Sequence, residues 1–195
     1  MGWEKFREGL FDGIYHELGH IIADSVYFPN NSTIQGMLFG RQPNGAYMFN
    51  TVCSDVNWKQ SKHILACAVV CISGGVFQQI KTLDMSPNNY NHWEKLISYV
   101  SPKRALIAYL QRVIQSQIKG MERDFDICNE GLIQLGGKIS LEKAKKKAIL
   151  LLLPYANKNS IDEISNIIAD RIVEQKSEVF VSVEEIKPYL IEKAT

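Results

Sequence analysis

The pentapeptide His16-Glu17-Leu18-Gly19-His20 is the part of the sequence with the clearest capacity for chemistry. Its two histidines stand four residues apart, so in a helix they lie on one face, where two imidazoles can bind one metal ion. Glu17 points beside that ion and can take a proton from a water on Zn²⁺. The pattern therefore predicts His16 and His20 as zinc ligands, Glu17 as the catalytic base, and peptide hydrolysis without a covalent intermediate.

A catalytic zinc site of this kind needs a third protein ligand. The metzincin continuation is absent, because Val26 stands where that family has its third histidine. Candidates further along the chain are His63, Asp84 and His92. His63 stands among lysine and glutamine residues and Asp84 in a turn-rich segment, whereas His92 begins an expected capped helix. We expect His92 to complete the site, with Asp84 and His63 as the alternatives.

The pattern of apolar residues predicts the elements that position the pentapeptide. Apolar residues recur every three or four positions over 3–27, which predicts a helix that carries the motif. Two β-favouring runs, 33–39 and 46–52, predict a small hairpin or meander, and a second long helix is expected at about 55–80. The sheet should present an edge near the zinc, where a substrate peptide can add as an extra strand.

The remainder of the chain predicts mainly helices. They are expected at about 102–135, 140–153, 160–176 and 183–192, with a brief extended segment at 179–183. We therefore expect an α+β, predominantly helical fold in a single compact domain. Residues 1–100 would form a zincin-like core with the metal site, and residues 101–195 a helical C-terminal bundle packed on it.

Composition and charge limit the classes of molecule that the protein is expected to bind and the setting in which it is expected to work. Lys and Arg number 22 against 21 Asp and Glu, a net charge of +1, so the basic surplus typical of nucleic-acid binding is missing. The spacing of Cys67 and Cys71 in an apolar run indicates core thiols, in keeping with a reduced, cytoplasmic setting. The uncharged stretch 64–80 falls short of the ~20 apolar residues of a membrane span and is interpreted as a buried helix.

The order of these features resembles the peptidase domain of FtsH-type zinc proteases, the membrane-anchored AAA+ proteases. In that family an H-E-A-G-H helix precedes two strands, a helix with A-G-R-x-A-E-E, and a G-A-x-N-D-[LI] element whose aspartate is the third zinc ligand. Here residues 32–41 and 44–49 look like the strands, 73–80 stands at the A-G-R-x-A-E-E element, and 91–93 falls on N-D-[LI]. The resemblance implies zinc as cofactor, a peptide or unfolded protein as substrate, and His92 in the aspartate position.

The sequence also departs from that family in two respects. Gln78 and Gln79 stand where the family has paired glutamates, and a neutral amide lacks the negative charge that a carboxylate offers a metal-bound histidine. No G-x-x-x-x-G-K-[ST] phosphate-binding loop occurs in the 195 residues, so we expect no ATPase motor in this chain. An inactive zincin-fold binding or regulatory module is therefore the alternative to a peptidase. The oligomeric state is left open.

Overall fold

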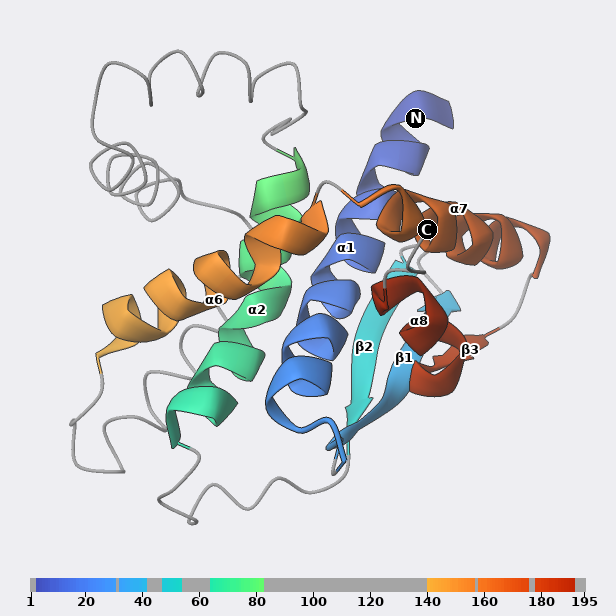
Figure 1. Cartoon of the computed structure of the whole chain (residues 1–195). Coiled ribbons are helices and arrows are strands. Elements are labelled where there is room, and N and C mark those ends of the chain that lie inside the picture. Colours follow the sequence, from blue (N-terminus) through green and yellow to red (C-terminus); the bar gives the residue numbers. More distant parts are fainter. Residues whose placement is uncertain are drawn as a thin grey trace.

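The computed structural model describes residues 3–30, 32–41, 47–53, 64–82, 140–156, 158–175 and 178–191 (Figure 1). Along these residues the element order is α1 (Trp3–Tyr27), β1 (Ile34–Arg41), β2 (Tyr47–Cys53), α2 (Ile64–Thr82), α6 (Leu141–Ala156), α7 (Asn159–Glu174), β3 (Val179–Ser182) and α8 (Val183–Leu190). The described part of the chain is predominantly helical with a small antiparallel sheet, as expected for an α+β protein.

Helix α1 runs through the middle of the described fold (Figure 1). It packs against α2, α6 and α7 as well as against β1 and β2. Its apolar residues recur every three or four positions, so they form a continuous stripe along the helix that can be buried. They are buried almost completely: Leu10, Ile14, Leu18, Ile21 and Ile22. The predicted helix over 3–27 is confirmed, and the helix that carries the pentapeptide is a central core element.

Three antiparallel strands form the sheet, in the order β2-β1-β3. In the middle strand, Leu38 pairs with Asn50 of β2 on one side and with Phe180 of β3 on the other. The two predicted strands of the hairpin are thus confirmed, and so is the extended segment near 179–183. The expectation of a helical C-terminal bundle needs a correction, because this region also supplies β3 to the sheet.

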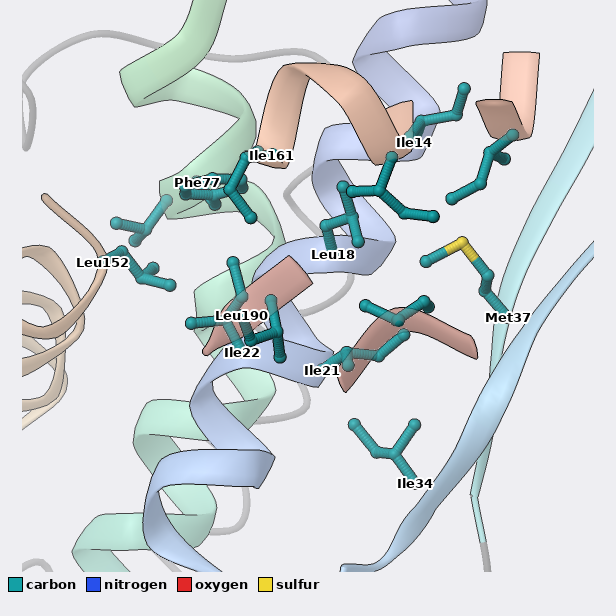
Figure 2. Packing of buried hydrophobic residues seen from close by; sticks show 14 of the residues in the cluster. Ile14, Leu18, Ile21, Ile22, Ile34, Met37, Phe77, Leu152, Ile161 and Leu190 are labelled. Atoms are coloured by element: carbon teal, nitrogen blue, oxygen red, sulfur yellow. The ribbon is translucent and has the colours of Figure 1, made fainter. Parts of the chain in front are cut away.

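One hydrophobic core joins the N-terminal and C-terminal parts (Figure 2). Around α1 it gathers buried side chains from β1 and from the other described helices: Met37, Phe77, Leu152, Ile161 and Leu190. Packing of this kind excludes water from apolar surface, which is the main favourable term in folding. Segments before residue 83 and after residue 140 therefore depend on each other for stability.

The other helices follow the prediction closely where the structure describes them. Helix α6 ends at Ala156 rather than at 153, continuing past the exposed Pro154. A proline in the last turn removes a single helical hydrogen bond, so it does not end the helix at once. The start of the predicted 55–80 helix and the predicted 102–135 helix lie outside the described residues.

Helix α2 has an additional property. By length and composition, its segment Ile64–Lys81 is apolar enough to cross a membrane, contrary to the expectation that this stretch falls short. In this fold 61% of the segment is buried inside the protein, where α2 packs against α1 and α6. A buried core helix has the same composition as a spanning helix, so the criterion alone does not separate the two.

Candidate metal centre

Helices α1 and α2 cross at a point of very close contact. A Cβ atom on Gly19 of α1 would overlap the carbonyl oxygen of Ser73 and lie 2.7 Å from Cβ of Phe77. Glycine is therefore the residue that lets the two backbones approach this closely. As a result, the face of α1 that carries His16 and His20 lies directly against α2.

Both imidazoles are held by hydrogen bonds to α2. His20 Nδ1 donates to the carbonyl oxygen of Val70 at 2.8 Å, and His16 Nδ1 donates to Oε1 of Gln78 at 3.2 Å. Because each Nδ1 faces an acceptor, Nδ1 is assigned as the protonated nitrogen in both rings, which leaves Nε2 with its lone pair. The two Nε2 atoms face each other at 3.3 Å.

This arrangement of nitrogens fits a metal ion. Two nitrogens bound to one tetrahedral Zn²⁺ at about 2.0–2.1 Å lie roughly 3.3–3.4 Å apart, which agrees with the 3.3 Å between the Nε2 atoms. Two lone pairs at that distance repel unless a proton or a cation lies between them. Gly74 of α2 leaves room at this point, because a Cβ there would overlap Nε2 of His20. His16 and His20 are therefore able to hold one zinc ion together.

Glu17 lies on a different side of α1 and contacts the sheet. Its side chain is only 4% exposed. The hydroxyl of Thr51, on β2, donates a hydrogen bond to Glu17 Oε2. A buried carboxylate is stable only when hydrogen-bonded or paired with a charge, so this contact helps to keep Glu17 in place. A carboxylate next in sequence to a metal-binding imidazole can act as a general base.

A polar cluster around Lys81 ties together α1, α2, α6 and α7. Lys81 Nζ binds Asp162 Oδ1 at 2.5 Å, donates to the carbonyl oxygen of Ala156 at 3.0 Å, and lies 5.0 Å from the ring centre of Tyr15. Burial, followed by the nearby charge of Asp162, raises the pKa of Tyr15 to about 12. Tyr15 precedes His16, so this cluster fixes the start of the motif.

Asp24 is a buried carboxylate that the sequence analysis did not identify. It is fully buried and accepts hydrogen bonds from the hydroxyls of Ser32 at 2.5 Å and Thr33 at 2.7 Å, and from the Ile34 amide at 3.4 Å. These bonds join the end of α1 to the start of β1. The charge of Asp24 adds to burial in raising the pKa of the half-buried Cys67 thiol. Asp24 is thus a structural residue one turn beyond His20.

The predicted third ligand lies outside the described residues. His92 and its alternatives Asp84 and His63 all fall in ranges that the structure does not describe. Within the described ranges, no three His, Cys, Asp or Glu side chains come together as a metal-binding group. The third ligand stays a prediction.

Gln78 lies within the described residues and contacts His16. Its proximity to the histidines was predictable only through the resemblance to FtsH-type peptidase domains. The contacts of Thr51 and Val70 with the motif were not predicted from the sequence.

No family model, curated protein or solved structure matches this chain.

Proposed function

We propose that this chain is a zinc-dependent metallopeptidase of the zincin type, similar to FtsH-type peptidase domains, that cleaves peptides or unfolded protein segments. One observation carries the proposal: the Nε2 atoms of His16 and His20 converge at 3.3 Å while both Nδ1 atoms donate to α2. The buried Glu17, next to His16 in the sequence, supplies the carboxylate that metal-assisted hydrolysis needs.

In this mechanism zinc, when bound, lowers the pKa of its water to about 7 and polarises the scissile carbonyl. His16 and His20 hold the ion, and Gln78 and Val70 keep the imidazoles in the tautomer that presents Nε2. Glu17 accepts a proton from the attacking water and passes it to the leaving amine. A helix buried in the core keeps these side chains in register, which catalysis requires.

The third ligand belongs to the same proposal. His92 would complete the set of three protein ligands that a catalytic zinc needs beside its water. Histidine and carboxylate are both accepted zinc ligands, so a histidine at the position where the similar family has aspartate is compatible with hydrolysis.

A second function is favoured by the contact between Gln78 and His16. The acceptor for His16 Nδ1 is a neutral amide, which makes the imidazole a weaker ligand than a carboxylate would. A zincin-fold binding or regulatory module, which holds zinc without cleaving peptides, would tolerate this weaker imidazole ligand. The presence of Glu17, a carboxylate that zinc binding alone does not need, favours the peptidase.

Substitution of the base separates these functions. Glu17→Gln should keep about one zinc per chain and lose hydrolysis of an unfolded, quenched protein substrate, because the base is not a ligand. Glu174→Gln, at an exposed position in α7, is the matched control and should keep both. A parent chain that binds zinc but cleaves no unfolded substrate supports the non-catalytic module, and a parent chain that binds no zinc contradicts both functions.

A further inference from the structure

Strand β2 contacts α1 at two points whose spacing along the strand matches their spacing along the helix. The Phe49 ring packs on Gly13 so closely that a Cβ there would lie 2.6 Å from ring atoms, and two residues later Thr51 donates to Glu17. Phe49 and Thr51 share one face of the strand, about 6.8 Å apart. Gly13 and Glu17 are one helical turn apart, about 6 Å. The contact of Phe49 with Gly13 therefore brings Thr51 to the level of Glu17.

The partner of Glu17 is a rigid one. Thr51 is paired with Met37 in the antiparallel ladder between β2 and β1, so its backbone is fixed. Its side chain is β-branched, which restricts rotation about χ1. A glutamate, in contrast, loses considerable rotamer freedom when it is held in one orientation. A fixed hydroxyl on Oε2 thus sets the direction of the buried Glu17 carboxylate.

We infer that Thr51 is a positioning residue, which holds the Glu17 carboxylate in the orientation in which it acts as a base. This inference rests on the proposed function. Loss of the hydroxyl should impair the proton transfer while leaving the ligands His16 and His20 untouched, because neither contacts Thr51 through a hydrogen bond described here. Misplacement of a reacting group by about 1 Å is enough to reduce a rate ~10²-fold.

Helix α1, which carries Glu17, also carries a second buried carboxylate that offers a matched control. Thr33 donates its hydroxyl to the buried carboxylate of Asp24 at 2.7 Å, one helical turn beyond His20. Thr33→Val therefore removes the same kind of hydrogen bond, from threonine to a buried carboxylate of α1, without touching Glu17. Any effect of Thr51→Val that exceeds the effect of Thr33→Val is specific to the site rather than to the loss of stability.

The experiment compares the full-length parent with Thr51→Val, Thr51→Ser and Thr33→Val. Each protein is loaded with Co²⁺, whose visible spectrum responds to hydrogen bonding at its open coordination position, and with Zn²⁺ for kinetics on an unfolded quenched substrate. We expect Thr51→Val to bind both metals like the parent, to change the cobalt spectrum in the direction of Glu17→Gln, and to lower kcat at least about 10-fold at unchanged KM. Thr51→Ser should restore both properties, and Thr33→Val should change neither.

The outcomes separate this inference from the proposed function. Parental kcat and cobalt spectrum in Thr51→Val overturn the inference alone. A cobalt spectrum that changes in Thr51→Val and recovers in Thr51→Ser, in a chain without turnover, upholds the positioning role and overturns the peptidase. A parent chain that binds neither metal overturns both.

Discussion

Gly74 of α2 lies directly against the Nε2 edge of the His20 ring. A Cβ at position 74 would overlap Nε2 of His20 and lie 2.6 Å from its Cδ2 and 2.8 Å from the His16 carbonyl oxygen. Every other amino acid would therefore occupy the space beside Nε2, the nitrogen assigned to zinc in the proposed function. Gly74 leaves space beside the His20 ring, just as Gly19 leaves space where α1 approaches α2.

Gly74→Ala should therefore abolish zinc binding, or weaken it at least ~10-fold, because the added methyl group displaces the His20 ring. Zinc content by elemental analysis and zinc affinity by chelator competition measure this. Gly9→Ala is the control, because among the described residues a Cβ there meets no atom within 4 Å apart from the adjacent backbone of α1 itself. That variant should keep its zinc and gain up to about 1 kcal/mol of stability from the helix preference of alanine. Parental zinc affinity in a folded Gly74→Ala protein would show that the ion does not lie at this point.

The hydrogen bond between Gln78 and His16 makes a second prediction. Gln78→Leu removes the acceptor for Nδ1, so the imidazole loses a contact that fixes its tautomer and orientation. Zinc affinity should fall about 10–100-fold, the usual effect of losing such a partner. Gln78→Glu should instead raise the affinity above that of the parent, because a carboxylate makes the imidazole more basic. Equal zinc affinities of the parent and the two variants would contradict a ligand role for His16.

The third prediction concerns the ligand that completes the site. His92→Ala should weaken zinc binding, and His92→Asp should largely restore it, because a carboxylate oxygen binds zinc at a similar distance. Asp84→Ala and His63→Ala should bind zinc like the parent. If one of these two loses zinc while His92→Ala keeps it, the third ligand is that residue, and the match to the FtsH-type order is out of register in this region.

Much of the fold could be predicted because local patterns dominate it. The predicted bounds of helix α1 are confirmed at both ends, since 25 residues of helical periodicity are followed by the Pro29 turn. Strand β3 is harder, because its four residues gain their partner from β1, about 140 positions earlier in the chain. A local signal did exist there: Ser182 and Glu185 have the spacing of a capping box, which marks the start of α8.

The candidate site was predictable in the parts that depend on helix geometry alone. The spacing of His16 and His20 placed both on one face, as the structure has them. The residues that hold the motif were not predictable in this way, because Thr51 and Val70 are 34 and 50 positions away from their partners. Such contacts follow from tertiary packing, and no periodicity in the sequence records them.

The last prediction concerns acid stability. Glu185 accepts hydrogen bonds from Arg171 Nη1 at 2.8 Å and from the Ser182 amide at 3.1 Å, and the bond to Arg171 is the main reason that its pKa lies below the ordinary 4.5. A lowered carboxyl pKa means that stability is present above pH 4.5 and is lost as the pH falls through the folded-state pKa. Glu185→Ala should reduce the free energy of unfolding by about 0.5–1 kcal/mol at pH 7, a typical cost for a lost cap. Urea titrations should show this difference shrinking at pH 3, whereas Glu184→Ala, at a neighbouring exposed position, should have a smaller effect at pH 7. A difference between parent and Glu185→Ala that is the same at pH 7 and pH 3 would assign the effect to helix propensity rather than to the charged cap.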